Sequence, residues 1–365
     1  MTTVKQITTF LETIAPLALQ ESYDNAGLII GDENIEVKGV LICLDSTEDV
    51  IEEALKHGCN LIIAHHPIVF SGLKKLNGKN YVERTVIKAI KNNVAIYAAH
   101  TNLDNVLEGV NAKICERLGL KNCTILSPMK NLLKKLVTFC PVDHAEKVRT
   151  ALFDAGSGQI GNYDECSFNA EGTGTFRAGE GTSPFVGEKG KQHHEKEIRI
   201  ETIFESYLET KIIRALLETH PYEEVAYDIY SLDNSYRETG SGMIGELEAP
   251  MEEIAFLALL KSTMKTGCVR YTKLTGKKIT RVAVCGGSGS FLLNDAIRQG
   301  AQVFVTSDFK YHQFFDADGK IVIADIGHYE SEQFTKDLFH DLLVKNFSTF
   351  AVRLSEVGTN PVNYF

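Results

Sequence analysis

Short apolar runs alternate with helical patterns between residues 38 and 120. The predicted strands are 38–45, 60–67 and 94–100, and the predicted helices are 46–58, 81–93 and 108–120. Ser46 is expected to cap the first of these helices and Gly58 to end it. Strands that are apolar throughout and alternate with helices of this length indicate a buried, parallel α/β sheet.

The same alternation returns after about residue 250. Apolar runs at 281–287, 301–308, 320–328 and 350–356 predict strands, and helical patterns cover 291–300 and 331–347. The C-terminal part of the chain therefore resembles the N-terminal part in class, and we expect the two to form one α/β domain.

The middle of the chain has a different pattern. Residues 157–196 contain eight glycines and few apolar runs. On either side, 135–156 predicts a strand followed by a helix, and 197–232 predicts strand, helix and strand. This order is typical of a small ferredoxin-like α+β module with a long polar insertion. We therefore predict a two-part α/β domain, 1–128 and 240–365, built on mainly parallel sheets and interrupted by a module at 129–239.

Composition narrows the class of protein. Thirty-eight basic and 48 acidic residues give a net charge of −10, so no general basic footprint for nucleic acid is present. No run of 18 apolar residues predicts a membrane span, and the first residues do not have the pattern of a secretory signal. None of the eight cysteines is spaced as CxxC, which favours reduced thiols over a disulfide framework or a zinc-thiolate site. These features predict a cytoplasmic protein.

Histidines and carboxylates follow three of the predicted strands. His65 and His66 end the second strand, and Asp104 follows the third. His328 and Glu332 come after a late strand, and both would project from the strand–helix junction if Ser331 opened the next helix. In parallel α/β sheets ligands bind beyond the carboxyl ends of strands. Taken singly, each residue is as compatible with ordinary packing or a solvated surface as with a metal site.

Together these five side chains exceed the needs of one tetrahedral structural zinc. Imidazole suits zinc, iron, cobalt or manganese, and a carboxylate can bridge two cations. The set fits two divalent ions that activate water for hydrolysis. Asp308 and His312, which follow another strand end, are candidates for proton transfer. The glycine-rich segment CGGSGS (285–290) fits neither GxGxxG nor a P-loop, and a tight structural turn is its better interpretation.

Several longer segments resemble one family. They are SYDNAGLIIGD (22–32), LIIAHHP (61–67), HTNLDNVLEGVN (100–111), HPYEEVAYDIY (220–230), VAVCGGSGS (282–290) and DIGHYESE (325–332). In this order they resemble the NIF-three-like dinuclear-metal family, whose bacterial members are commonly named GTP cyclohydrolase 1 type 2 homologues. The resemblance covers essentially the whole chain and is to the longer bacterial form, in which a CutA-like module interrupts the metal-binding domain.

The resemblance implies a two-metal site at His65, His66, Asp104, His328 and Glu332, in a ring-shaped homohexamer. Our first hypothesis is a metal-dependent hydrolase of a nucleotide-like or phosphorylated small molecule, with Asp308 or His312 moving protons. The alternative is a non-catalytic metal-binding regulatory or interaction protein whose inserted module senses a ligand. A nucleic-acid-binding ring is disfavoured by the acidic charge.

Overall fold

The computed structural model describes residues 1–365, which divide into two compact units. Unit 1 consists of Met1–Pro128 and Arg237–Phe365, and unit 2 of Met129–Tyr236. No helix is both long and apolar enough to cross a membrane. All eight cysteines are free thiols and five of them are buried, as their apolar surroundings in the sequence predicted.

Unit 1 contains a five-stranded sheet in the order β1-β4-β3-β2-β15. These strands are β1 (Gly27–Ile30), β2 (Gly39–Cys43), β3 (Leu61–Ala64), β4 (Ala95–Ala98) and β15 (Ala351–Leu354). β15, β2, β3 and β4 run parallel, and β1 is antiparallel to β4. Every residue of β2, β3 and β4 is buried, because helices cover both faces of the sheet.

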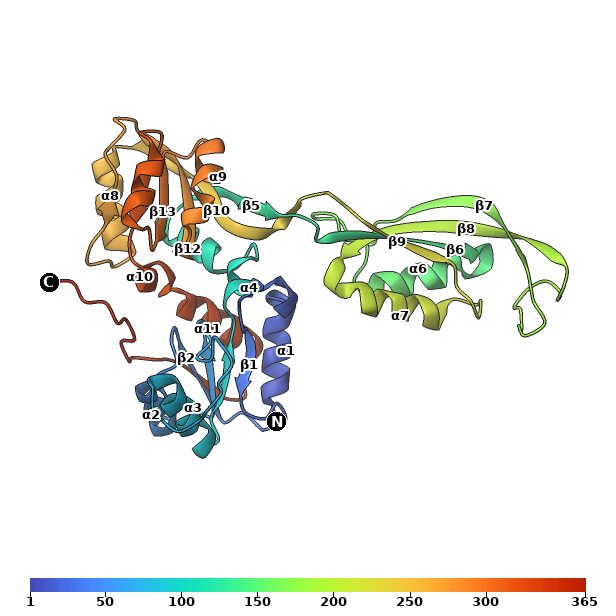
Figure 1. Cartoon of the computed structure of the whole chain (residues 1–365), viewed down its shortest axis with the longest axis horizontal. Coiled ribbons are helices and arrows are strands. Elements are labelled where there is room, and N and C mark those ends of the chain that lie inside the picture. The colour runs from blue at the N-terminus through green and yellow to red at the C-terminus, as the bar shows by residue number, and fades with distance from the viewer. The chain divides into compact units, whose positions relative to one another are not determined.

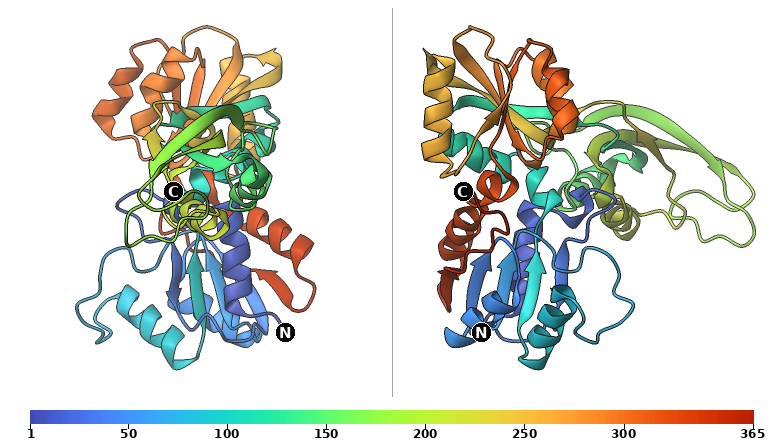
Figure 2. Two further views of the ribbon diagram at one scale, coloured as in Figure 1. Left: turned by 90° about the vertical axis from the view of Figure 1, so that its right-hand side faces the viewer. Right: turned by 60° about the vertical axis from the view of Figure 1, so that its left-hand side comes forward.

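The helices of this part lie on the two faces of the five-stranded sheet. α2 (Glu48–Lys56) and α3 (Tyr81–Lys91) cover one face, and α1 (Val4–Ile14) and α11 (Thr335–Asn346) lie on the other (Figure 2). Thr47, not Ser46, caps α2, since its side chain accepts the Val50 amide. Smaller elements here are α4 (Thr101–Asp104), α5 (Val110–Leu118) and the 3-10 turn η1 (Leu17–Leu19).

A second sheet of unit 1 has six strands in the order β11-β14-β13-β12-β10-β5. They are β5 (Lys121–Met129), β10 (Tyr236–Met251), β11 (Arg270–Tyr271), β12 (Ile279–Ser288), β13 (Val303–Ser307) and β14 (Val322–Asp325). The central strands β12, β13 and β14 are parallel, whereas β10 and β11 pair antiparallel with β12 and β14. Both sheets of unit 1 are therefore mixed: one edge strand of the five-stranded sheet is antiparallel, and antiparallel strands flank the three parallel strands of the six-stranded sheet. α8 (Glu253–Thr263), α9 (Leu293–Arg298), α10 (His328–Glu332) and the 3-10 turns η4 (Ser290–Leu292) and η5 (Tyr311–Ala317) complete this part.

Unit 2 has the element order β-α-β-β-α-β. Its elements are β6 (Leu133–Pro141), η2 (Val142–His144), α6 (Ala145–Asp154), β7 (Phe168–Arg177), β8 (Gln192–Glu205), η3 (Ser206–Leu208), α7 (Glu209–Thr219) and β9 (Tyr227–Ser231). The sheet order is β7-β8-β6-β9 and all its pairs are antiparallel, which is the ferredoxin-like arrangement. α6 and α7 lie side by side on one face of this sheet (Figure 1). The likeness of unit 2 to CutA stays a prediction.

The polar insertion that the sequence predicted at 157–196 is in part regular structure. It contains all of β7 and the first residues of β8. The two strands pair antiparallel along the whole of β7, with Phe168 opposite Glu201 at one end and Arg177 opposite Gln192 at the other. β7 has no buried residue, so its sequence lacks the apolar alternation that marks a strand. Backbone pairing with β8, which apolar periodicity does not reveal, defines this strand.

Candidate metal centre

The predicted metal-binding side chains lie at the carboxyl ends of strands in unit 1. His65 and His66 directly follow β3, and His100 follows β4 and precedes the short helix α4, which ends at Asp104. β14 leads through Gly327 into α10, whose first and last residues are His328 and Glu332. This helix begins at His328 rather than at Ser331, so the two side chains are one helical turn apart on the same face.

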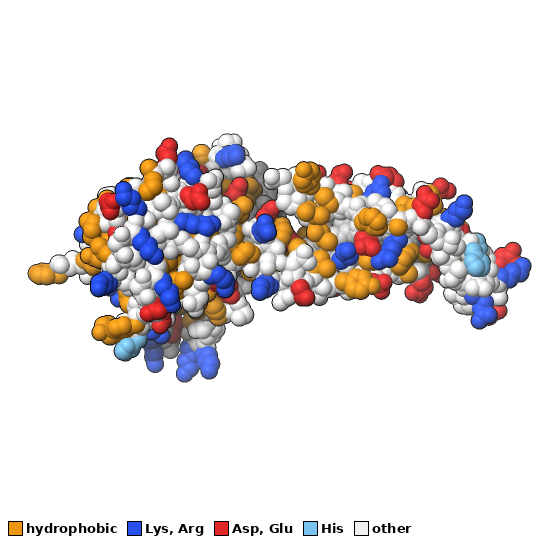
Figure 3. Space-filling model, turned by 90° about the horizontal axis from the view of Figure 1, so that it is seen from above, with side chains coloured by type: hydrophobic (Ala, Val, Ile, Leu, Met, Phe, Trp, Pro, Cys, Tyr) orange, Lys and Arg blue, Asp and Glu red, His pale blue; other side chains and the backbone are white.

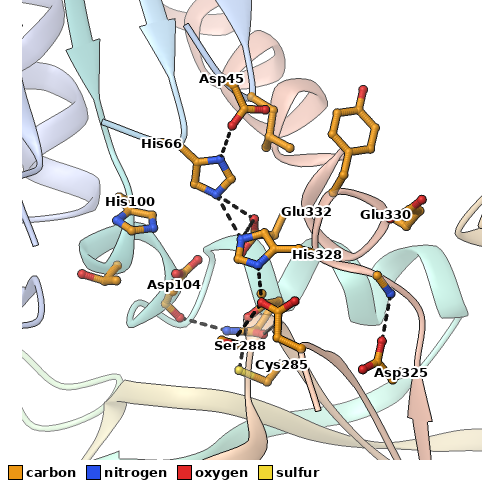
Figure 4. A pocket seen from close by; sticks show the side chains of 18 of the residues that line it. Asp45, His66, His100, Asp104, Cys285, Ser288, Asp325, His328, Glu330 and Glu332 are labelled. Carbon is orange, nitrogen blue, oxygen red and sulfur yellow. Dashed lines mark hydrogen bonds and ion pairs between the residues drawn. The ribbon is translucent and has the colours of Figure 1, made fainter. Parts of the chain in front are cut away.

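Glu332 is at the centre of the cluster. Its Oε2 lies 3.0 Å from Nε2 of His66 and 3.2 Å from Nε2 of His328. Its Oε1 lies 3.6 Å from Nε2 of His65, which is itself 3.7 Å from Oδ1 of Asp104. Figure 4 shows His66, His328 and Glu332 converging in this way. Glu332 thus belongs to two groups able to hold a cation, one with His65 and Asp104 and one with His66 and His328.

Two buried atoms of this cluster have no hydrogen-bond partner. They are Nε2 of His65 and Oδ1 of Asp104. His65 is fully buried, and Glu332 is 2% exposed. Buried polar atoms are nearly always paired in folded proteins, and an unexplained exception calls for a partner such as an ion. An imidazole nitrogen and a carboxylate oxygen are donors suited to a divalent transition metal, so these residues fit such an ion.

Each of the four histidines here is oriented by a hydrogen bond at its Nδ1 atom. The acceptors are the Ala99 carbonyl for His65 (2.9 Å), Asp45 for His66 (2.7 Å), Asp24 for His100 (2.7 Å) and Asp308 for His328 (2.7 Å). When Nδ1 carries the proton in such a bond, the lone pair of Nε2 is available to a cation. A carboxylate or carbonyl behind each imidazole is the usual outer arrangement of metal-binding histidines.

The charges of the cluster shift its pKa values strongly. Burial raises the pKa of Glu332, but electrostatic attraction to His65 and hydrogen bonds from His328 and His66 hold it well below the usual range. Burial, reinforced by the charge of Glu332, raises the pKa of Asp104 well above normal.

The histidine pKa values diverge from one another. Burial lowers the pKa of His65. Burial also opposes protonation of His66, but its bonds to Asp45 and Glu332 raise the pKa to about 9. For His328, burial is outweighed by Asp308 and Glu332, which raise the pKa to about 11. His66 and His328 therefore favour the protonated state near neutral pH, and metal binding must displace their protons.

The cluster faces a cavity of about 710 Å³ within unit 1. Gly287 lies at its wall with φ +61°, and a Cβ there would come within 2.5 Å of Oε1 of Glu332. The Gly286 and Gly287 amides donate to the side chains of Asn111 and Ser331, each at 2.9 Å. The CGGSGS segment therefore lets two parts of the chain approach closely, and these two amides bind protein atoms rather than an anion.

The two candidates for proton transfer differ in position. Asp308, in a left-handed conformation with φ +60°, accepts a hydrogen bond from Ser288 at 3.1 Å and holds His328. Asp308 therefore orients His328 and does not itself belong to either donor group. His312 lies in η5, is exposed and does not line the cavity, and its ring contacts Tyr311 and Phe315. The structure therefore does not bring His312 to the site.

Sequence reasoning assigned no role to three residues of the site, although His100 was noticed at the end of the predicted strand 94–100. Asp24 and Asp45 orient His100 and His66, and His100 lies with His65 and His66 in a third group able to hold a cation. Asp45 does end a predicted strand and Asp24 lies in the family segment 22–32, which are the only sequence signals for them. Their pairing with particular histidines depends on the fold.

The C-terminal segment contributes to the same site. The hydroxyl of Thr359 donates to Oδ2 of Asp45 at 2.7 Å, and the amide of Asn360 donates to Glu330 at 3.1 Å. Val362 and Tyr364 also line the cavity. The chain end thus steadies the carboxylate that orients His66.

A mixed α/β unit with a buried histidine–carboxylate cluster at its strand ends defines a protein with a candidate metal site. The family model of Duf34/NIF3 (NGG1p interacting factor 3) matches residues 2–361. The chain belongs to this family.

Curated relatives and solved structures agree with this assignment. The GTP cyclohydrolase 1 type 2 homolog of Halalkalibacterium halodurans is 40% identical, with 97% of this chain and 96% of that protein covered. The Bacillus subtilis protein of the same name is 38% identical, with 99% and 98% covered. The crystal structure of a Bacillus cereus protein related to NIF3 matches with a TM-score of 0.85 at 40% identity, covering 100% and 99% of the two chains.

Proposed function

We propose that this protein is a metal-dependent hydrolase that uses two divalent ions to act on a nucleotide-like or phosphorylated small molecule. The observation that carries the proposal is the position of Glu332, whose two oxygens belong to two different donor groups at the wall of one cavity. A carboxylate shared in this way is suited to bridging two cations.

The donor groups assign a residue set to each ion. His65, Asp104 and Oε1 of Glu332 would hold one, and His66, His328 and Oε2 of Glu332 the other. Imidazole with carboxylate suits zinc, iron, manganese or cobalt. Ions held here would supply Lewis acidity and lower the pKa of bound water, the chemistry of hydrolytic two-metal sites.

The charge of the cavity makes substrate binding depend on the metal. Seven carboxylates line it, and Arg270 is its only Lys or Arg. Arg270 is already paired with Asp325 and also donates to the Phe309 carbonyl at 3.2 Å. The metal-free site would repel a phosphorylated substrate, so the bound ions must offset the negative charge of the carboxylates.

His100 is the residue that we assign to proton transfer. It lines the cavity, Asp24 fixes its Nδ1 at 2.7 Å, and one of its ring nitrogens is within 4.8 Å of donor atoms of His65 and His66. A histidine oriented in this way can take a proton from, or return one to, a group at the metal centre. Asp308 acts by positioning His328, and His312 has no part in this proposal.

The assembly and the partner class complete the proposal. A ring-shaped homohexamer is part of it, and light scattering on the purified protein tests this state. Basic and acidic side chains are interspersed over the face in Figure 3, with no continuous basic stripe. This distribution supports a small-molecule substrate over nucleic acid.

The test is turnover by metal-depleted protein reconstituted with one metal at a time. GTP comes first because the curated relatives bear the name GTP cyclohydrolase 1 type 2 homolog, and a panel of phosphomonoesters and phosphodiesters follows. We expect metal-dependent hydrolysis that is lost in His66→Gln and kept in Glu330→Gln, a buried carboxylate of α10 outside both donor groups. Tight binding of metal with no turnover of any substrate would support the non-catalytic regulatory alternative instead.

A further inference from the structure

Unit 2 contains a cavity of about 760 Å³ that the proposed hydrolase does not use. It lies on the sheet face opposite α6 and α7. Ile198 and Ile200 of β8 pack toward these helices, so Glu197 and Arg199, which alternate with them, face the cavity. Its volume falls within the range of small-molecule binding sites.

A buried carboxylate forms part of the cavity wall. Glu197 is 8% exposed and has no ion-pair partner. Its Oε1 accepts a hydrogen bond from the Tyr222 hydroxyl at 2.9 Å. On the neighbouring strand, a Cβ at Gly174 would come within 2.1 Å of Oε2, so a side chain there would displace this carboxylate. A charge withdrawn from water in this way is costly unless a cation compensates it.

Three aromatic rings line the same cavity as this carboxylate. The Tyr222 ring centroid is 5.9 Å from that of Phe176 and 6.4 Å from that of Phe185, and all three rings line the cavity. Ring faces attract cations, most strongly where water is excluded, and clusters of aromatic rings recognise organic ammonium ions.

The sequence HPYEE (220–224) builds this wall. His220 donates from Nε2 to the Phe139 carbonyl at 2.9 Å, and its Nδ1 accepts the Tyr222 amide at 3.1 Å, which fixes the turn that carries Tyr222. Glu223 accepts the Ser183 amide at 2.8 Å and so holds the loop that bears Phe185. The family segment 220–230 therefore has a role in unit 2 that the metal centre, which lies wholly in unit 1, does not explain.

We propose that this cavity binds a small organic cation, with its ammonium group against Glu197 and its carbon substituents against Phe176, Phe185 and Tyr222. A bare metal ion fits less well because three of the walls are rings. An anion fits less well because four glutamates and two arginines line the cavity, and Arg199 is paired with Glu201 at 2.8 Å. The proposal does not depend on the activity of unit 1.

The experiment is calorimetric titration of the full-length protein with choline, n-butylammonium, 3,3-dimethyl-1-butanol, inorganic phosphate and Mn²⁺, the last after the metal centre has been saturated. The alcohol has the shape of choline without its charge. We expect saturable binding of at least one of the two cations, one per chain, with a Kd of about 1 mM or tighter. The alcohol should bind at least about tenfold more weakly. The comparison of choline with the neutral alcohol uses the wild-type protein alone, so it does not depend on whether a variant folds.

Variants then locate the site. Glu197→Gln should weaken cation binding at least about tenfold, because it keeps the shape and removes the charge. Glu218→Gln, an exposed carboxylate of α7 on the opposite face of the sheet and outside the cavity, is the control and should bind as wild type does. Melting curves and metal content verify that both variants are folded.

Three results would overturn the proposal. They are no saturable binding of either cation up to about 10 mM, equal binding of the neutral alcohol, and cation affinity that Glu197→Gln leaves unchanged. Preferential binding of phosphate or Mn²⁺ would assign the cavity to another ligand class and would equally contradict it.

Discussion

Replacing Glu332 by Gln tests the metal centre most directly. The substitution keeps the size of the side chain and removes the charge shared by both donor groups. An amide also presents only one oxygen, so it cannot serve two cations as a carboxylate does. We expect the variant to hold fewer ions and to hold the remaining one more weakly.

The magnitude follows from the distances. Glu332 Oε2 is 3.0 Å from Nε2 of His66, and at that separation two unit charges interact by about 5 kcal/mol if the effective dielectric constant is about 20. Reorganisation of the site recovers part of this energy. Loss of a residue that merely orients a ligand costs about 10- to 100-fold in metal affinity, so loss of a shared ligand should cost at least about 100-fold, or about 3 kcal/mol.

The measurement has two parts. Elemental analysis after gel filtration should find close to two ions per chain in the wild type and one or fewer in Glu332→Gln, and competition with a chelator gives the affinities. For any substrate that the wild type hydrolyses near neutral pH, the turnover rate of the variant should be at least about 100-fold lower. The matched control is Glu330→Gln, which lies two residues away on the same short helix and contacts no histidine of the cluster.

The reasoning would be refuted by a folded Glu332→Gln protein that retains two ions with affinities within about threefold of wild type. Glu332 would then not be a shared ligand, and the two-ion assignment would have to be abandoned. Loss of metal in Glu330→Gln to the same extent would mean that the helix, rather than the carboxylate, had been disturbed.

Three further predictions concern the surroundings of the cluster. Asp45→Asn removes the carboxylate that orients His66 and should weaken metal binding by about 10- to 100-fold with the ligands intact, measured by chelator competition. Since the metal-free pKa is about 9 for His66 and about 11 for His328, both favour the protonated state at pH 7.5. Metal uptake at pH 7.5 should therefore release at least one proton per chain, and the affinity for metal should rise with pH. Calorimetry in buffers of different ionisation enthalpy measures the proton release, and uptake without release of protons would contradict the prediction. Replacing residues 129–236 by a Gly/Ser linker should leave a folded unit 1 that still binds metal, and a folded product without metal would disprove this independence.

Local pattern was sufficient to predict seven strands of unit 1, namely β2, β3, β4, β12, β13, β14 and β15, but not β1, β5, β10 or β11. β2, β3 and β4 are buried along their whole length, so their apolar runs are visible in the sequence. A residue that directly follows such a strand must lie at the edge of the sheet. His65 follows a strand of the five-stranded sheet and Glu332 comes after β14 of the six-stranded sheet, so the pattern predicted that each lies near a strand end, whereas their 3.6 Å contact depends on how the two sheets pack.

Contacts between distant and polar segments could not be predicted in the same way. Asp24 orients His100 from 76 residues away, and Asp45 orients His66 from 21 residues away. The strand end at Asp45 and the family segment around Asp24 do not show which histidine each aspartate orients, since solvated carboxylates are frequent at such positions. β7 was missed for a related reason, because backbone pairing rather than apolar burial defines it.

The interruption of unit 1 has a structural explanation in its second sheet. β5 leads out to unit 2 and β10 returns from it, and the two are neighbours in that sheet. They approach so closely that a Cβ at Gly240, where φ is +152°, would lie 2.2 Å from the Ser127 carbonyl. The chain leaves and re-enters unit 1 at adjacent positions, so the insertion does not pull the two parts of unit 1 apart. The entropic cost of closing the loop also rises only slowly with the length of the insertion. Glu332 can therefore meet His65 and Asp104 although a complete folding unit separates them in sequence.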